Sequence, residues 1–217
     1  FMLPTFGNAY FVMASTATEY ADFSKQFKVA YDDGTVSVQN DVDTAVNQCT
    51  ASKGDVIYVA PGHTETLSAA SGWDLDVAGI TVIGLGNMNN RPVISFSATA
   101  SDIEIGAENV RLSNMELLST VDSLVNFVDV NDSNFRIDNC LIRTTSAKEA
   151  VAGIDLATTQ DNFEVVDCEF RQDTDPAGTD AAAGTGSIYL VDTENLLVKG
   201  CVFRDQWETA SIHNKTT

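Results

Sequence analysis

Hydrophobic and polar positions follow one pattern that recurs four times in the second half of the chain. Each copy begins with Asn, alternates apolar and variable residues, breaks at Asn, Asp or Gly, and resumes after Met or Cys. The copies are NVRLSNMEL from Asn109, NFRIDNCLI from Asn134, NFEVVDCEF from Asn162 and NLLVKGCVF from Asn195, with a weaker copy, GITVIGLGN, from Gly79. Because strict alternation is typical of β-strands, each copy predicts two short strands that meet at a bend.

When the copies are aligned, the residues at each equivalent position, which we call a column, are of one chemical type. Two apolar columns precede the break, and they are Ile80, Val110, Phe135, Phe163, Leu196 and then Val82, Leu112, Ile137, Val165, Val198. The break column contains residue types that tolerate left-handed backbone angles, namely Gly84, Asn114, Asn139, Asp167 and Gly200. The next column is a core ladder of Leu85, Met115, Cys140, Cys168 and Cys201, and the last apolar column is Leu117, Ile142, Phe170 and Phe203.

A second apolar alternation precedes each copy, so each repeat predicts three short strands. These pairs are Trp73/Leu75, Ile103/Ile105, Val128/Val130, Ile154/Leu156 and Ile188/Leu190. Repeats of about 25 to 33 residues indicate a solenoid, in which like columns stack from one turn to the next. We therefore expect an all-β fold, a parallel β-helix of about five turns. Its variable spacing falls in one loop per turn, above all in residues 172–187.

The first 37 residues do not fit the repeat and are expected to form a small segment of their own. Their pattern predicts a strand at 9–13, a helix at 18–27, and a turn followed by a strand at 35–38. This segment is either a small apolar cap or an N-terminal strand that pairs elsewhere, or it serves for attachment or oligomerisation. The chain is therefore expected to have three parts. They are the N-terminal segment at 1–37, the solenoid with its capping helix at 38–205, and a C-terminal tail or end cap at 206–217.

Residues 40–50 predict a helix with Val42, Ala45, Val46 and Cys49 on one face and Asn40 or Asp41 as its cap. An apolar strand within GDVIYVAPG, at residues 54–62, follows this helix. The first turn of a solenoid exposes open backbone groups and apolar interior, so we expect the helix to cover that end.

From about residue 35 to residue 205, the chain resembles a known class of proteins. The helix DVDTAVNQC, followed by GDVIYVAPGHTET and stacked turns, looks like the opening of pectin-lyase-like right-handed β-helix proteins. The stretch GDVIYVAPGHTETLSAASGWDLDVAGITVIGLG is more similar to β-helix proteins encoded in the structural gene clusters of tailed phages. The resemblance implies a right-handed solenoid and a trimeric protein of the virion surface, and it identifies no catalytic motif that carries over residue by residue.

The net charge of the chain argues against two classes of binding partner. The 217 residues carry 12 Lys and Arg against 31 Asp and Glu, a net charge of −19. Nucleic acids and anionic membranes both require a basic face, so neither is an expected partner. The sequence also predicts no cofactor, no metal site and no catalytic residue.

Outward carboxylates gather on the middle strands, at Asp74, Asp76, Asp102, Glu104, Asp129, Asp155, Asp192 and Glu194. They are interpreted as solvated surface residues, with calcium binding or a catalytic carboxylate pair as the alternative. His63 and His213 are the two histidines, and spacing gives neither a nucleophilic partner. The cysteines of the core ladder are interpreted as buried apolar residues rather than zinc ligands.

Three arginines share one position, nine residues after the first Asn of their copies. They are Arg143, Arg171 and Arg204, and we call them the arginine row. Stacked cations would repel, so we expect carboxylates such as Glu169 and Asp205 to lie between them. The row is interpreted either as a surface ion-pair row or as a contact with an anionic sugar or a partner subunit. Asp173 and Asp175 in the long loop, and Trp207 after the last repeat, are further candidate contacts.

Three functions remain open. The leading hypothesis is a non-enzymatic structural protein of a phage particle, extracellular and on the virion surface, as capsid decoration or part of a tail spike or fibre. It would form a homotrimer and contact other virion proteins. The alternatives are a lyase or hydrolase that degrades host surface polysaccharide, and a sugar-binding adhesin. Few outward aromatic residues occur in the repeats, with Tyr58 and Tyr189 ambiguous, and this favours the structural hypothesis.

Overall fold

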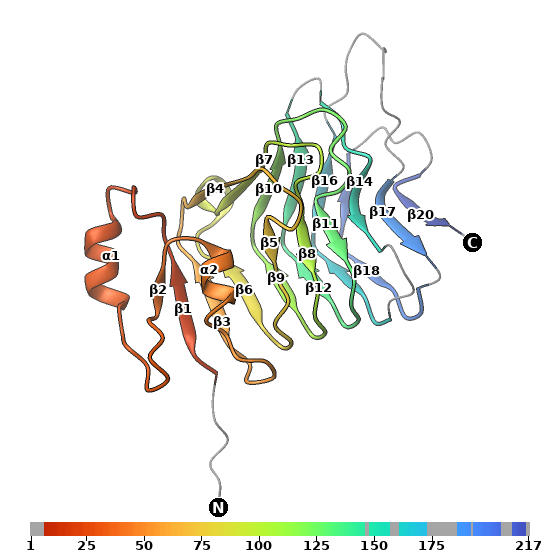
Figure 1. Cartoon of the computed structure of the whole chain (residues 1–217). Coiled ribbons are helices and arrows are strands. Elements are labelled where there is room, and N and C mark those ends of the chain that lie inside the picture. Colours follow the sequence, from red (N-terminus) through yellow and green to blue (C-terminus); the bar gives the residue numbers. More distant parts are fainter. Residues whose placement is uncertain are drawn as a thin grey trace, which may run out of the picture.

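Three parallel sheets run along one axis in the computed structural model of the chain (Figure 1). The structure describes residues 7–145, 148–156, 161–172, 186–191, 193–204 and 210–215. Sheet 1 has the strand order β18-β15-β12-β9-β6-β3-β1-β2, sheet 2 the order β19-β16-β13-β10-β7-β4, and sheet 3 the order β20-β17-β14-β11-β8-β5. The chain passes from sheet 3 to sheet 1 to sheet 2 and then returns, as in β5, β6, β7 and β8.

The strands are short, as the repeat predicts. Sheet 1 contains β1 (Ala9–Val12), β2 (Val38–Gln39), β3 (Val56–Val59), β6 (Thr81–Gly84), β9 (Arg111–Ser113), β12 (Arg136–Asp138), β15 (Glu164–Val166) and β18 (Leu197–Lys199). Sheet 2 contains β4 (Thr64–Leu67), β7 (Val93–Phe96), β10 (Glu116–Ser119), β13 (Leu141–Thr144), β16 (Glu169–Arg171) and β19 (Val202–Phe203). Sheet 3 contains β5 (Trp73–Asp74), β8 (Ile103–Ile105), β11 (Val128–Val130), β14 (Ala152–Asp155), β17 (Gly186–Val191) and β20 (Ile212–Lys215). The helices are α1 (Tyr20–Phe27), α2 (Val42–Val46) and the 3-10 turn η1 (Met88–Asn90).

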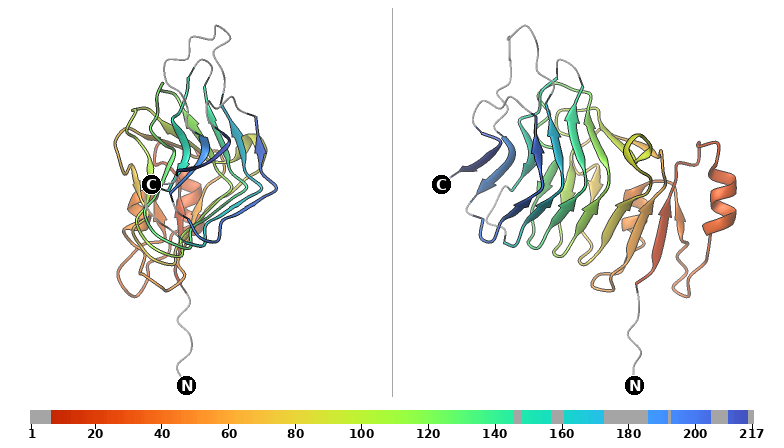
Figure 2. Two further views of the ribbon diagram at one scale, coloured as in Figure 1. Left: turned by 90° about the vertical axis from the view of Figure 1, so that its right-hand side faces the viewer. Right: turned by 180° about the vertical axis from the view of Figure 1, so that it is seen from behind.

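The predicted all-β architecture with three parallel strands per repeat is confirmed. Viewed along the axis, successive turns of the chain lie one behind another (Figure 2). Neighbouring strands pair in register, for example Val82 with Leu112, Leu112 with Ile137 and Ile137 with Val165. The columns read from the sequence are therefore real columns in space.

The inward columns form one continuous hydrophobic core. Ile80, Val110, Phe135 and Phe163 are each at most 1% exposed, and Phe135 stacks on Phe163 with ring centroids 5.7 Å apart. In the core ladder Met115, Cys140 and Cys168 are buried as predicted, whereas Cys201 and Leu85 are only partly buried. Full burial of a large apolar side chain stabilises the fold by about 1.5–3 kcal/mol, so these columns supply most of the favourable free energy.

Each repeat has two corners with a left-handed residue, where the sequence pattern indicated one bend. At the break column, Asn114, Asn139 and Asp167 have φ of 58°, 54° and 53°. The first Asn of every copy is also left-handed, with φ between 58° and 61° at Asn109, Asn134, Asn162 and Asn195. Gly84 was wrongly assigned to the break column, because the left-handed residue in that copy is Gly86, with φ of 95°.

Asparagine amides stack along both corners. Nδ2 of Asn162 donates to Oδ1 of Asn134 at 2.9 Å, and Nδ2 of Asn195 donates to Oδ1 of Asn162 at 3.2 Å. At the second corner Nδ2 of Asn139 donates to Oδ1 of Asn114 at 2.9 Å. Asparagine therefore supplies both the left-handed backbone and a hydrogen bond to the next turn, and glycine supplies only the first.

The N-terminal end is covered by α2, as predicted. Asp41 is its N-cap and accepts a hydrogen bond from the Thr44 N–H at 2.7 Å, while Val42, Ala45 and Val46 are buried. The helix is shorter than the expected 40–50. The strand expected at 35–38 was placed too early, because β2 is Val38–Gln39.

Part of the 1–37 segment belongs to the solenoid. Strand β1 lies between β3 and β2 in sheet 1, and Tyr10 and Val12 on it are fully buried. Helix α1 lies farther out, and none of its residues is buried. Phe27 of α1 stacks on Phe11 of β1, with ring centroids 4.7 Å apart, so the helix is held by aromatic contacts on the outer face of the sheet.

Substitutions of Asn139 test the two roles of the corner asparagines. Asn139→Gly keeps the left-handed backbone and loses the hydrogen bond, so we expect a loss of about 1 kcal/mol. Asn139→Val loses both and should cost about 2–3 kcal/mol. Urea unfolding measures the difference, and equal losses for the two variants would contradict the conformational role.

Cys168→Asp tests the inward column. It places an unpaired charge in the core, and we expect a loss of several kcal/mol or failure to fold. Cys201→Asp is the matched control, because Cys201 is only partly buried. Melting followed by circular dichroism should show a much larger drop for the first variant, and equal drops would show that burial does not govern the column.

Candidate functional site

The arginine row lies on the outer face of sheet 2. Arg143 and Arg171 are register partners on β13 and β16, and the N–H of Arg204 donates to the carbonyl of Phe170 at 2.9 Å. The three guanidinium groups therefore follow the solenoid axis, and their side chains are 34%, 49% and 64% exposed in chain order. The structure brings these three predicted residues together.

Two glutamates bind the three arginines. Arg143 binds Oε1 of Glu116 through Nε at 2.8 Å and Nη2 at 2.6 Å. Arg171 and Arg204 both donate Nε to Oε1 of Glu169, each at 2.7 Å. The expectation of interleaved carboxylates is confirmed at Glu169, whereas Glu116 was missed. Glu116 occupies the same column as Glu169, two positions before the arginine position, so the repeat contained the signal.

These contacts fix the charge state of Glu169. Its hydrogen bond from Arg171 lowers its pKa, and the bond from Arg204 lowers it further, against a smaller opposing effect of burial. Glu169 is therefore a carboxylate at neutral pH and is unsuited to donate a proton as a general acid.

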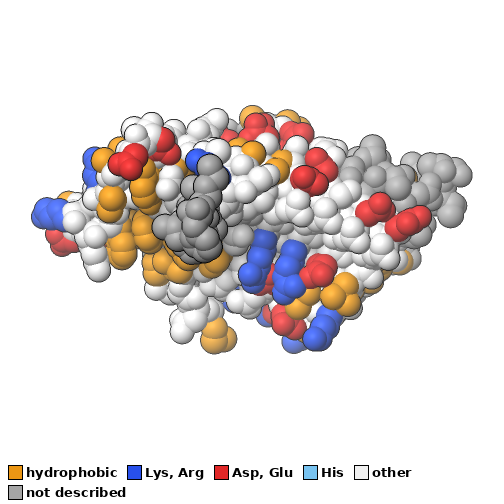
Figure 3. Space-filling model, turned by 90° about the horizontal axis from the view of Figure 1, so that it is seen from below, with side chains coloured by type: hydrophobic (Ala, Val, Ile, Leu, Met, Phe, Trp, Pro, Cys, Tyr) orange, Lys and Arg blue, Asp and Glu red, His pale blue; other side chains and the backbone are white. Residues whose placement is uncertain are grey.

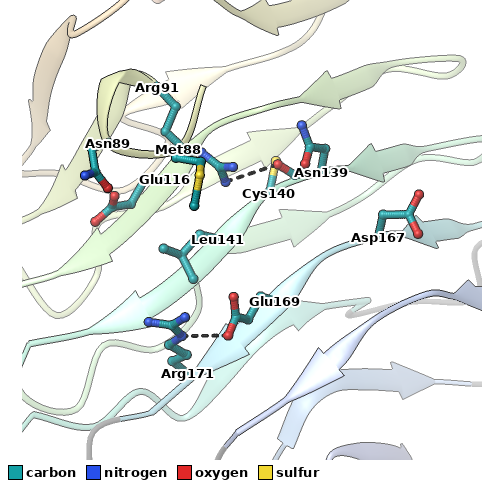
Figure 4. Close-up of a pocket in the computed structure, with 10 residues that line it drawn as sticks. All are labelled: Met88, Asn89, Arg91, Glu116, Asn139, Cys140, Leu141, Asp167, Glu169 and Arg171. Atoms are coloured by element: carbon teal, nitrogen blue, oxygen red, sulfur yellow. Dashed lines mark hydrogen bonds and ion pairs between the residues drawn. The ribbon is translucent and has the colours of Figure 1, made fainter. Parts of the chain in front are cut away.

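Two hollows of about 280 Å³ each adjoin the row. The first lies toward the corner with sheet 1, with Leu141 in its middle and Arg91, Glu116, Asp167 and Glu169 around it (Figure 4). Arg91 donates Nη1 to the carbonyl of Asn139 at 3.3 Å. The second hollow is lined by the arginine row with Thr144 and Gln172. Polar and charged side chains make up most of the lining of both hollows.

A second ion network, which was not predicted from the sequence, crosses the outer face of sheet 1. Arg111 makes two hydrogen bonds to Asp138, at 2.7 and 3.0 Å, and the Ser113 hydroxyl donates to the same carboxylate at 2.7 Å. Arg136 donates Nε to Asp138 at 3.0 Å and Nη1 to Glu164 at 2.6 Å, so it links the two carboxylates. Burial alone would raise the pKa of Asp138, but these hydrogen bonds outweigh burial and lower it. Viewed from below, hydrophobic side chains gather at the N-terminal end of the molecule, and cations lie beside carboxylates farther along (Figure 3).

Sheet 3 carries a row of like charges. Asp74, Glu104, Asp129 and Asp155 are successive register partners on its outer face, and we call them the acidic row. Burial and then the neighbouring carboxylates Asp76, Glu104 and Asp43 raise the pKa of Asp74. Burial and the charge of Glu104 likewise raise the pKa of Asp129, against a hydrogen bond from Asn131. The charged neighbours that act on these two carboxyls are acidic, so Asp74 and Asp129 are under electrostatic repulsion.

His63 is part of a polar cluster under the cap. Its Nδ1 accepts the Ala14 N–H at 3.2 Å, so Nε2 carries the hydrogen and donates to Glu65 at 3.1 Å. Glu65 also accepts from the Trp73 indole at 2.7 Å and from the Val42 N–H at 3.4 Å. Glu65 is the register partner of Ile94, so a carboxylate replaces an apolar residue at the capped end of an inward column. This cluster ties α2, β4 and β5 together and is structural.

Of the remaining residues that the sequence offered for a functional site, the structure describes some and leaves others out. His213 on β20 lies against Tyr189, with ring centroids 5.1 Å apart at an edge-to-face angle. Hydrogen bonding to Cys140, together with burial, raises the pKa of Cys168, so its thiol stays neutral and unreactive. Asp173, Asp175, Asp192, Asp205 and Trp207 lie outside the described residues.

Two further features are not found in the part of the chain that the structure describes. Within it, no group of three or more His, Cys, Asp or Glu side chains is placed to hold a metal ion. None of the helices described is long and apolar enough to cross a membrane.

Asp129→Asn should stabilise the protein. A folded-state pKa above the unfolded value means that stability is complete at low pH and is lost as the pH rises through the folded pKa. The variant cannot ionise, so between about pH 4 and pH 7 its advantage over the wild type should grow, to about 2 °C in Tm. Asp32→Asn, an exposed site outside the row, is the charge-matched control. Equal effects of the two variants would contradict repulsion within the acidic row.

Searches of protein-family models, curated proteins and solved structures found no match to this chain. The resemblance to phage β-helix proteins therefore stays a prediction.

Proposed function

We propose that this chain is a non-enzymatic structural protein of a phage particle. It serves on the virion surface, as capsid decoration or as part of a tail spike or fibre. The observation that carries the non-enzymatic part is that the arginines and carboxylates of the ion networks on sheets 1 and 2 are bound to one another. The resemblance of residues 35–205 to phage β-helix proteins carries the location.

The ion pairs support a structural role because a catalytic carboxylate needs freedom to change its protonation state. Glu169 and Asp138 have lowered pKa values and accept hydrogen bonds from arginine. Such groups stabilise a surface and hold their charge. The rigid parallel sheets suit an exposed particle component in the same way, because hydrogen-bonded turns resist local opening.

The finer features of the proposal follow from general rules and from the resemblance. The solenoid is right-handed, as parallel crossover connections nearly always are, and has about five turns. Residues 1–37 attach or trimerise the protein, and residues 206–217 form its tail or end cap. Its partners are two further copies of itself and other virion proteins in an extracellular setting, and it binds neither nucleic acid nor membrane.

A second candidate function is a polysaccharide lyase, a hydrolase or an adhesin for host surface polysaccharide. The two hollows beside the arginine row are the observation that favours it, since their arginine, amide and carboxylate groups match the hydroxyl and acidic groups of sugars.

A turnover assay separates these functions. The purified chain is incubated with acidic and neutral polysaccharides, and polymer length and new reducing ends are followed with time. We expect no shortening and the same result for Glu169→Gln. Turnover by the wild type that Glu169→Gln abolishes would overturn the structural proposal. Binding without turnover, lost in Arg171→Ala, would establish the adhesin instead.

A further inference from the structure

The outer faces of sheets 2 and 3 carry opposite charges in the same turns of the solenoid. Asp129 on β11 and Arg143 on β13 belong to one turn, and Asp155 on β14 and Arg171 on β16 belong to the next. In the turn after that, Tyr189 on β17 continues the acidic row in register, and Arg204 follows β19. Each turn in this region therefore presents a guanidinium on sheet 2 and a carboxylate or phenol ring on sheet 3.

The distance between successive side chains along the axis is the same in the arginine row and in the acidic row. Each row advances by one strand per turn, and neighbouring strands lie about 4.8 Å apart in both sheets. Two copies placed side by side with parallel axes would thus match all three pairs at once, with no adjustment along the axis. A row of scattered surface charges has no such property.

The arginine row, and Asp74 and Asp129 of the acidic row, have capacity for a further partner. The arginine row has three cations against two glutamates, Glu116 and Glu169, and Arg171 and Arg204 share one oxygen of Glu169. Both of these bonds use Nε, and a guanidinium has four further N–H groups in a planar fork. On the other side, Asp74 and Asp129 lie among carboxylates that repel them. An approaching row of guanidinium groups would relieve that repulsion.

We propose that copies of this chain associate side by side with parallel axes, the acidic row of one copy facing the arginine row of the next. The occupant of each face is a second copy, and the contact is heterologous, since different faces meet. Such a contact closes into a ring when the rotation between copies allows it, as in the trimer proposed above. The pairs are Asp129 with Arg143, Asp155 with Arg171, and Tyr189 with Arg204 through a cation–π contact. This inference deepens the proposed function by assigning the surface through which copies meet.

The test uses the full chain and measures mass by light scattering across a range of concentrations and salt. We expect an assembly that weakens with salt, because the contacts are charged. Arg143→Glu with Arg171→Glu should raise the dissociation constant about tenfold or more. Lys53→Glu with Lys199→Glu, outside both rows and equal in charge change, is the control and should keep the wild-type mass.

Mixing makes the experiment decisive. Asp129→Arg with Asp155→Arg should also prevent self-association, and a mixture of the two reversed proteins should associate again, because each then offers the other an opposite face on both sides. The two variants must alternate, so the mixture should form dimers or even-numbered rings rather than the trimer. Recovery on mixing also shows that both variants are folded. An assembly that survives both reversals would overturn this surface while leaving an oligomeric virion protein intact. A wild type that is monomeric at every concentration would overturn the inference and the proposed trimer together, and the turnover assay would still decide the non-enzymatic role.

Discussion

In-register stacking of parallel strands is the constraint on which the whole structure depends. A strand side chain within a sheet has neighbours of the same column about 4.8 Å above and below it, so each column must consist of residues that pack favourably against residues of the same type. Apolar columns meet this condition easily, and aromatic residues gain from it, as in the stacks of Phe135 on Phe163 and Phe170 on Phe203. Asparagine meets it too, because its amide both donates and accepts, which allows the ladder from Asn134 to Asn195.

Charged columns are the difficult case, and the chain treats them in two ways. On sheets 1 and 2, carboxylates stand between the arginines, so that Asp138 serves Arg111 and Arg136, and Glu169 serves Arg171 and Arg204. On sheet 3, four carboxylates follow one another in the acidic row. Partial burial makes their repulsion stronger, since water screens it less. On this face the pKa values of Asp74 and Asp129 are raised, whereas on the other faces arginines lower the pKa values of Asp138 and Glu169.

The columns were predictable because each is a local property of one repeat copy. Alternation set the inward positions, the recurring Asn set the length of each turn, and Val42, Ala45 and Val46 marked the capping helix. What escaped prediction depends on contacts between turns or on backbone angles that composition does not reveal. The left-handed Asn134 and Asn162 lay at the start of an apparent strand, and Glu65 was hidden in an inward column because its partners Trp73 and Val42 lie on other elements. The arginine row was found as a column, but its pairing with Glu116 required the sheet register.

The difference between the faces bears on the proposed association between copies of this strongly acidic protein. A net charge of −19 opposes the approach of two copies at long range. Screening weakens that repulsion beyond about 8 Å at physiological ionic strength, and contacts at hydrogen-bond distance are then decided by local charge. Along the last three turns the local charge of sheet 2 favours anions and that of sheet 3 favours cations, so one relative orientation of two copies gains while most others lose. The same stacking rule that forces like charges into rows thus supplies the periodic match that a specific contact between copies requires.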